Sequence, residues 1–316
     1  MAGKASHSFV SSDNTLRGIA FKVGSVAVFV AMASLIKAAG QLPAGQIVFF
    51  RSFFAIFPIL LMLAWRHELR TALHTARPLS HVARGAVGVM SMGFGFFALT
   101  RLPLPEAITL NYAQPLLVVL FSALFLGETV RAYRWTAVLI GLAGVVIVSW
   151  PNLSLFGRGV SMEVTAGVFA ALVSAVLSAV AMLLVRSLVH TERTSTIVLW
   201  FSLTASAMTL LSALFGWELL SPSQAICLIL AGICGGIGQM MMTEAYRHAE
   251  ASTVAPFEYT SMILGIVVGY FAFGDVPTAY TIVGGLIVIG AGIFIIVRER
   301  RLGLERGTAR KVAPPQ

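Results

Sequence analysis

Charged side chains are scarce in this chain of 316 residues. Only 11% are Asp, Glu, Lys or Arg, against about 25% in an average soluble domain. Apolar residues make up 58% of the sequence, and its mean hydropathy is +0.88. A soluble domain needs more polar surface than this composition supplies. The scarcity of charge therefore excludes a soluble fold and predicts an all-α integral membrane protein.

Cysteine is rare, and the common catalytic motifs are absent. Cys227 and Cys234 lie on one predicted helix, about 10 Å apart along its axis, which is too far for a disulfide. The sequence has no paired-carboxylate metal motif, no His-x-x-Glu-His run, no nucleophile elbow and no Gly-x-x-x-x-Gly-Lys-Ser/Thr loop. We therefore expect no metal, no cofactor and no enzymatic activity. A membrane-embedded enzyme is kept as an alternative, and a pore ranks last because no selectivity filter is visible.

The basic residues report topology. The formal net charge is +9, but these residues sit singly between apolar runs and form no stripe for nucleic acid. Most of them fall on one side of the expected bilayer, whereas Lys37, Arg101 and Arg158 fall on the other. Cytoplasmic loops retain positive charge, so both termini should be cytoplasmic.

Ten apolar runs punctuate the chain and predict ten transmembrane helices. They lie near residues 18–37, 44–65, 82–99, 105–126, 132–150, 164–185, 195–216, 225–246, 251–273 and 277–297. This gives an N-terminal cytoplasmic segment 1–17, a five-helix repeat 18–150, a periplasmic linker 151–163, a second five-helix repeat 164–297 and a basic tail 298–316. We expect the tail to be disordered and to touch membrane lipid.

The two halves resemble each other in sequence. Aligning the second half on the first pairs Gly88 with Gly235, Tyr112 with Tyr259 and Glu128 with Asp275. An odd number of spans in each repeat places the second copy upside down in the membrane. Inverted repeats of this kind are typical of secondary transporters that alternate access to a site near the midplane.

Four short motifs add a resemblance to a known family. They are Phe49-Phe50-Arg51-Ser52, Leu126-Gly127-Glu128, Glu258-Tyr259-Thr260-Ser261 and Phe273-Gly274-Asp275-Val276-Pro277. With them the whole chain resembles the drug/metabolite transporter superfamily, specifically its ten-helix EamA-type carriers. The resemblance implies a bacterial inner-membrane carrier, often an exporter of amino acids such as the aromatic ones. Related members take up riboflavin, S-adenosylmethionine or other metabolites.

Arg51 is an isolated charge inside the second predicted span. An ionised side chain at that depth is costly unless it faces a cavity or a partner. Its counterpart in the second half is Trp200 or Phe201. We predict that Arg51 binds a substrate carboxylate or acts as a gate. The alternative is a structural arginine neutralised by backbone carbonyls or by Glu106.

Two carboxylates are candidates for proton coupling. Glu258 lies in the ninth predicted span next to Tyr259, where it could exchange a proton or bind a substrate ammonium. The alternative is a structural hydrogen bond to a neighbouring helix. Glu244 is nearer the end of the eighth span and could instead pair with Arg247 or Arg84.

Polar and aromatic side chains in the spans complete the predicted site. The predicted polar lining is Ser91, Asn111, Tyr112, Gln114 and Gln239, each of which could alternatively bond neighbouring helices. Trp200 and Tyr259 are predicted to stack on an aromatic substrate, with packing inside the bundle as the alternative.

Proline and glycine positions suggest bends and close helix contacts. Pro115 and Pro256 are predicted hinges, because proline bends a helix. The pairs Gly232/Gly236 and Gly265/Gly269 favour packing within the bundle over a dimer seam, so we expect a monomer. Together these features predict a secondary transporter of small amphipathic metabolites, exporting aromatic or other apolar amino acids. Uptake of riboflavin or S-adenosylmethionine is the alternative.

Overall fold

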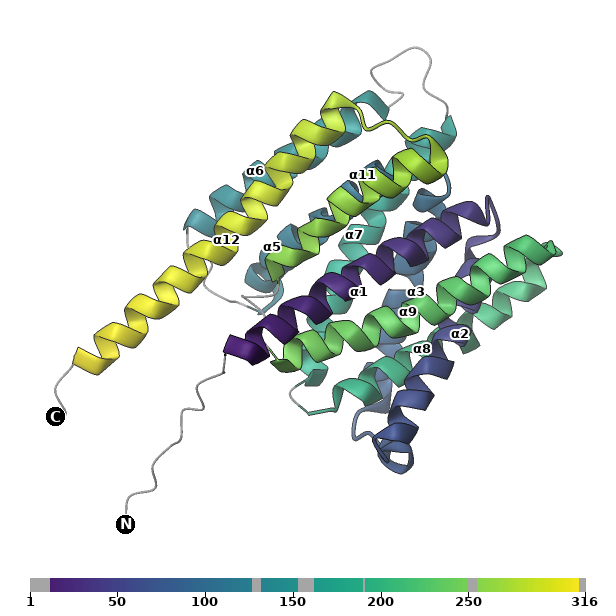
Figure 1. Cartoon of the computed structure of the whole chain (residues 1–316), viewed down its shortest axis with the longest axis horizontal. Coiled ribbons are helices and arrows are strands. Elements are labelled where there is room, and N and C mark those ends of the chain that lie inside the picture. The colour runs from purple at the N-terminus through teal and green to yellow at the C-terminus, as the bar shows by residue number, and fades with distance from the viewer. Residues whose placement is uncertain (1–11, 127–131, 153–161, 190, 249–254, 313–316) are drawn as a thin grey trace.

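The computed structural model describes residues 12–126, 132–152, 162–189, 191–248 and 255–312, and every regular element among them is helical (Figure 1). Among these described residues, six helices are long and apolar enough to cross a membrane. They are α1 (Ser12–Ala38), α2 (Ala44–Trp65), α3 (Pro78–Leu99), α7 (Met162–Val189), α8 (Thr194–Leu210) and α9 (Pro222–His248). The prediction of an all-α integral membrane protein is therefore confirmed in its class.

Four shorter described helices lie between and after these six. They are α4 (Leu104–Asn111), α5 (Ala113–Leu126), α6 (Ala132–Ser149) and α11 (Thr260–Phe273). The last helix, α12 (Ala279–Val312), is longer, but its apolar part spans only Ala279–Ile295. Four 3₁₀ turns occur at η1 (Leu69–Thr71), η2 (Trp150–Asn152), η3 (Leu211–Phe215) and η4 (Ala255–Tyr259). The outward faces of the helices carry large apolar side chains such as Leu61, Phe215 and Phe271. Such a surface suits lipid and would aggregate in water.

The ends of the chain differ from the expectation. The basic tail from residue 298 was expected to be disordered, but α12 continues through it to Val312. The reason is local. The tail is rich in Leu, Glu, Ala, Arg and Lys, which are good helix formers, and it contains no proline between residue 298 and Pro314. At the other end α1 begins at Ser12, inside the segment 1–17 that was expected to precede the first span. The first turn of α1 and the last turn of α12 lie at the same end of the molecule (Figure 1).

Helices from the two halves of the chain pack against one another. The contacts join α1 with α9, α3 with α7, α2 with both α8 and α9, α4 with α11, and α6 with α12. In Figure 1, α6 and α12 run side by side along one edge, and α2, α8 and α9 gather at the other. The core is therefore an interface between the halves.

Glycines allow the closest of these approaches. Gly232 faces Phe50 and Phe54 of α2, and Gly236 faces Ala55 of the same helix. Gly265 and Gly269 of α11 face Ile108 and Pro105 of α4. The expectation that both glycine pairs serve packing within the bundle is confirmed.

Gly144 provides a test of this packing. A Cβ at Gly144 in α6 would lie 2.8 Å from the carbonyl oxygen of Gly284 in α12. We expect Gly144→Ala to separate the two helices and to lower stability by about 1–3 kcal/mol, the usual cost of overpacking. Thermal unfolding of the purified protein in detergent, followed by tryptophan fluorescence, measures the change.

Gly290→Ala is the matched control, because nothing lies within 4 Å of a Cβ at Gly290 on α12. Alanine is the better helix former, so this variant should be as stable as the wild type or more stable. Equal melting temperatures for the two variants would show that α6 and α12 do not pack this closely.

Candidate functional site

A cavity of about 650 Å³ lies inside the bundle, between segments of both halves. Its volume is in the range of small-molecule binding sites. Most of the wall is apolar and comes from α1, α3, α4, α5 and α7, with Met242 from α9 and three residues from η4 and α11. Among the predicted site residues the wall contains Ser91, Asn111, Tyr112, Gln114, Pro115, Glu258 and Tyr259.

A break in the fourth apolar segment positions part of this wall. The sequence predicted one helix over 105–126 with a hinge at Pro115, whereas the structure has two helices separated at Tyr112. A proline ring clashes with the carbonyl group four residues before it, which here belongs to Asn111. The helix therefore ends at Asn111, and Pro115 occupies the first turn of α5. This break leaves Asn111, Tyr112 and Gln114 lining the cavity.

The ninth apolar segment also changes its helix type beside the cavity. Its described part begins as the 3₁₀ turn η4, which contains Pro256 and Glu258, and becomes α-helical at Thr260. Tyr259 at this junction meets Tyr112 in a T-shaped ring contact, with centroids 5.2 Å apart. Two irregular segments, one from each half, therefore touch at the cavity wall.

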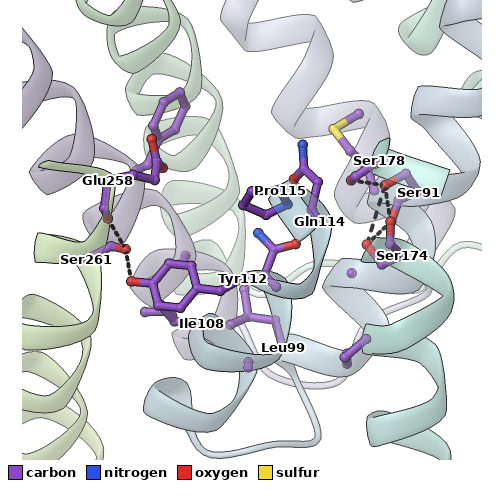
Figure 2. A pocket seen from close by; sticks show the side chains of 18 of the residues that line it. Ser91, Leu99, Ile108, Tyr112, Gln114, Pro115, Ser174, Ser178, Glu258 and Ser261 are labelled. Carbon is purple, nitrogen blue, oxygen red and sulfur yellow. Dashed lines mark hydrogen bonds between the residues drawn. The ribbon is translucent and has the colours of Figure 1, made fainter. Parts of the chain in front are cut away.

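A hydrogen-bonded chain runs from Tyr112 to the backbone beside Glu258 (Figure 2). Ser261 Oγ donates to the carbonyl oxygen of Glu258 over 2.7 Å. A serine hydroxyl has a single proton, so the Tyr112 hydroxyl donates to Ser261 in the contact between them. This chain orients the Tyr112 ring and ties α11 to the break between α4 and α5.

Lys22 of α1 forms an ion pair with the carboxylate of Glu258. The lysine side chain is only 1% exposed, whereas the glutamate side chain is 47% exposed because it borders the cavity. An ammonium group buried to this extent requires a charged partner. Glu258 therefore neutralises a buried cation and presents its free edge to the cavity.

Three serines, Ser91, Ser174 and Ser178, lie across the cavity from Glu258 and Tyr112 (Figure 2). Ser91 Oγ of α3 donates to the carbonyl oxygen of Ser174 over 3.0 Å and lies 2.6 Å from Ser178 Oγ. Ser174 Oγ in turn donates to the carbonyl oxygen of Ser91 over 2.8 Å. These bonds join α3 to α7, so Ser91 both lines the cavity and connects two helices.

A charged cluster joins α1 to α11 and α4 near the C-terminal end of α1. Lys37 Nζ donates to the carbonyl oxygen of Leu102 over 2.7 Å and lies 3.3 Å from Asp275 Oδ2. The same carboxylate oxygen accepts the backbone N–H of Leu104 over 2.8 Å. These bonds hold α1, the α3–α4 connection and the end of α11 together.

Four of the residues predicted to bind substrate or couple protons lie outside the cavity wall. Trp200 stacks on His81, and its Nε1 donates to the carbonyl oxygen of Leu73 over 3.2 Å, in the connection between α2 and α3. Gln239 is half-buried on α9. Glu244 forms an ion pair with Arg66.

Arg51 is the fourth of these residues. It is buried on α2, and no ion pair joins it to Glu106, whose Oε1 accepts a hydrogen bond from Thr281. The structure thus separates Arg51 from the partner that the sequence suggested.

Sequence reasoning missed Lys22 as a member of the site. It counted Lys22 among the residues that report topology, although Lys22 lies inside an apolar run. A lysine within a predicted span was the available signal. Ser174 and Ser178 carried no such signal, because serine is common in packed membrane helices.

The fold and the cavity define a class. The chain is a multi-pass α-helical membrane protein with an internal cavity of metabolite size, which is the architecture of a carrier. The chain belongs to the EamA-like transporter family, whose family model matches it twice, over residues 16–150 and 165–298. It is therefore a membrane transporter of the drug/metabolite transporter superfamily, as the sequence motifs predicted.

Three relatives illustrate the range of the family. The pseudopaline exporter CntI of Pseudomonas aeruginosa is 32% identical over 87% of this chain and 94% of its own length. An S-adenosylmethionine uptake transporter of Rickettsia felis is 26% identical over 81% of this chain and 84% of its own. A riboflavin transporter of Rhizobium johnstonii is 28% identical over 73% of this chain and 74% of its own length. A crystal structure with 23% sequence identity matches with a TM-score of 0.64 over 92% of this chain and 99% of that one, which shows the shared fold.

The Lys22–Glu258 pair can be tested by a double-mutant cycle. Lys22→Met removes the cation that pairs with Glu258, and Glu258→Gln removes the carboxylate that pairs with Lys22. Each should cost about 1–3 kcal/mol, below the usual cost for a fully buried pair because Glu258 is half-exposed. The double variant should be more stable than the sum of the single effects predicts, by about 1 kcal/mol. Thermal unfolding in detergent measures all three.

The control cycle combines Lys37→Met with Glu258→Gln. Lys37 lies on the same helix but pairs with Asp275, so these two effects should simply add. Additivity in the Lys22 cycle would show that the ion pair does not form in the purified protein.

Proposed function

We propose that this protein exports aromatic or other apolar amino acids across the bacterial inner membrane, as a secondary transporter with alternating access. The observation that carries this proposal is the chemistry of the cavity wall. Glu258 is the one charged side chain among the described residues that line it, and the rest is largely apolar. An amino acid with an apolar side chain has matching chemistry, since its ammonium group can pair with Glu258.

Tyrosine and phenylalanine rings suit the apolar part of such a substrate. Tyr112 and Tyr259 lie beside Glu258, and Phe29 and Phe96 contribute to the same wall. Aromatic rings attract other rings and cations at their faces. Asn111 and Gln114 would supply the remaining hydrogen bonds, and Ser91 would bound the opposite side.

The pairing of helices supports an inverted repeat of two five-helix halves, 18–150 and 164–297. If the repeat holds, α1 corresponds to α7, α2 to α8, and α3 to α9. The contact between α1 and α9 is then equivalent to the contact between α7 and α3. In the same way, the contact between α2 and α9 is equivalent to the contact between α8 and α3. The double match of the family model points the same way. We therefore propose ten spans, cytoplasmic termini and a monomeric carrier in lipid, with 151–163 as the periplasmic linker.

Alternating access requires one end of the cavity to close while the other opens. The cluster of Lys37, Asp275 and the α3–α4 connection lies at the end that the charge distribution predicts to be periplasmic. We propose that this cluster is the periplasmic closure, with the breaks near Pro115 and Pro256 as hinges.

The names of the relatives support both export and uptake as candidate directions of transport. The relative from Pseudomonas aeruginosa is named as an exporter, and it is 32% identical. Others are named as transporters of S-adenosylmethionine or riboflavin. Uptake of such a metabolite is therefore the second candidate function. All three are named as transporters, which supports a carrier over the membrane-embedded enzyme.

Transport by the purified protein in proteoliposomes tests the proposal. We expect saturable, time-dependent accumulation of labelled L-phenylalanine that stops when unlabelled L-phenylalanine is added in excess. Riboflavin and S-adenosylmethionine, offered in parallel, should not compete. Competition by either of them, together with absence of phenylalanine flux, would favour the second candidate.

Glu258 is proposed to couple transport to protons, and Glu258→Gln tests this role. An imposed pH gradient should change the rate of the wild type, and this response should vanish in the variant. The variant should also bind substrate about tenfold more weakly or worse, because one charge-assisted hydrogen bond is lost. Glu163→Gln, which alters an exposed carboxylate at the start of α7, is the matched control. A Glu258→Gln variant with an unchanged pH response would exclude Glu258 and leave Glu244 as the candidate.

The proposed topology is tested with alkaline phosphatase, which is active only in the periplasm. A fusion after Gln316 should be inactive, and a fusion after Leu219, in the exposed connection between η3 and α9, should be active. The reverse pattern would mean that the charge distribution has been assigned to the wrong side.

A further inference from the structure

Two arginines on neighbouring helices, Arg51 buried and Arg84 half-buried, have no counter-charge among the described residues. Arg51 of α2 is 8% exposed, and its Nε has no hydrogen-bond partner. Arg84 of α3 lies with its guanidinium carbon 3.7 Å from the centroid of the Phe201 ring, and its Nε and Nη1 are also buried without a partner. The ring face attracts the cation but provides no acceptor for its N–H groups.

Arg51 and Arg84 lie on helices that pack against each other, and the charge of Arg51 acts on Arg84. Two like charges in the interior of a membrane protein repel each other, and the buried Nε of Arg51 and the buried Nε and Nη1 of Arg84 have lost their contact with water. The usual solution is an anion between them. This arrangement therefore indicates that a negative charge belongs at this place.

The carboxylates that the structure describes inside the bundle are engaged elsewhere. Glu106 accepts a hydrogen bond from Thr281, and Glu244 pairs with Arg66. Glu258 pairs with Lys22, and Asp275 with Lys37. Within the described part of the chain, the anion that these arginines require does not come from the protein.

A glycine lies beside each of the two arginines, and one of them places Arg51 next to the cavity. A Cβ at Gly235 of α9 would lie 3.1 Å from Arg51 Nε and 3.2 Å from Met32 Sδ, and Met32 lines the cavity. A Cβ at Gly88 would lie 3.5 Å from Arg84 Nη1. Gly88 and Gly235 are the two glycines that the internal sequence alignment pairs. Each repeat therefore contributes a glycine beside one of the arginines.

The spacing along α3 connects the arginines to the cavity wall. Residues three or four apart on a helix share a face, and Arg84, Gly88, Ser91 and Gly95 follow this spacing. Ser91 and Gly95 line the cavity. One face of α3 thus leads from the cavity wall to Arg84, and the thin wall at Met32 and Gly235 separates the cavity from Arg51.

We infer that Arg51 and Arg84 form a binding site for a small anion with the chemistry of a carboxylate. Guanidinium groups present forked N–H donors that match a carboxylate geometrically. The anion is either the carboxylate of the transported amino acid or a free small anion. The first source rests on the proposed function, whereas the site itself does not.

Binding of formate to the purified protein tests the site without transport. Sodium formate is titrated in detergent, with Na-HEPES holding the ionic strength constant, and the melting temperature is recorded. The wild type should show a saturable rise, because a ligand that binds only the folded state stabilises it. Arg51→Met and Arg84→Met should each raise the apparent Kd about tenfold or more, because charge-assisted hydrogen bonds are lost.

Arg101→Met is the matched control. Its guanidinium carbon lies 3.6 Å from the centroid of the Phe97 ring, much as Arg84 lies over Phe201, but Arg101 also donates to the carbonyl oxygen of Phe97. This variant should keep the formate response. In Na-HEPES alone, Arg51→Met should melt at the wild-type temperature or above it, since it removes an unpaired charge. A lower melting temperature would mean that the protein itself neutralises Arg51, and the inference would be wrong.

L-phenylalanine and phenethylamine, which lacks the carboxylate, distinguish the two sources of the anion. Competition with formate by L-phenylalanine alone would identify the substrate carboxylate. Formate binding that neither compound weakens would identify a free-anion site, and it would stand even if phenylalanine is not transported. A wild-type melting temperature that formate does not change, or an equal rise in both Met variants, would overturn the inference.

Discussion

In a lipid bilayer every backbone polar group must find its partner inside the protein, so an irregular helix is tolerated only where it borders protein or a cavity. The fourth apolar segment breaks at Tyr112, and the described part of the ninth begins as a 3₁₀ turn that ends at Tyr259. The two tyrosine rings meet, and both segments line the same cavity. The position of the cavity follows from these two irregular places. Straight helices throughout would have filled this space with side chains.

Helix α1 is attached to the ninth segment at two levels. Lys22 pairs with Glu258 near one end of the cavity, and Lys37 pairs with Asp275 beyond the other. The two lysines are separated by about 22 Å along the helix axis. A ligand ammonium that approaches Glu258 would compete with Lys22 for the same carboxylate. Binding would then weaken one attachment of α1 while the other stays intact, which is a physical means of linking substrate binding to helix movement.

Charge inside this bundle falls into two groups. Lys22, Lys37 and Arg66 each pair with a carboxylate. Arg51 and Arg84 do not pair with one among the described residues. Since the interior of a membrane protein is a poor solvent for ions, the second group stands out by its lack of partners. Paired charges in this protein hold helices together, whereas the unpaired arginines are available to a ligand.

Much of the fold and part of the site could be predicted from the sequence. Glu258, Tyr112 and Gln114 were expected at the site because polar residues stand out within apolar runs, and all three line the cavity. Trp200 was expected at the site because its ring could stack on an aromatic substrate, but it packs on His81 outside the wall. Composition reports that a residue is unusual for a span, but it does not report which face of the helix carries it.

The sequence by itself determined the membrane class, the family and the approximate position of the apolar helices, because hydropathy and short motifs are local properties of the chain. Only the tertiary structure decided that Lys22 reaches Glu258, that Glu106 bonds Thr281 and not Arg51, and that Arg51 and Arg84 lie on contacting helices. These contacts join residues far apart in the chain, and they depend on the rotation of each helix about its axis. That rotation is set by packing between the two halves, where glycines such as Gly144 and Gly284 let the helices approach.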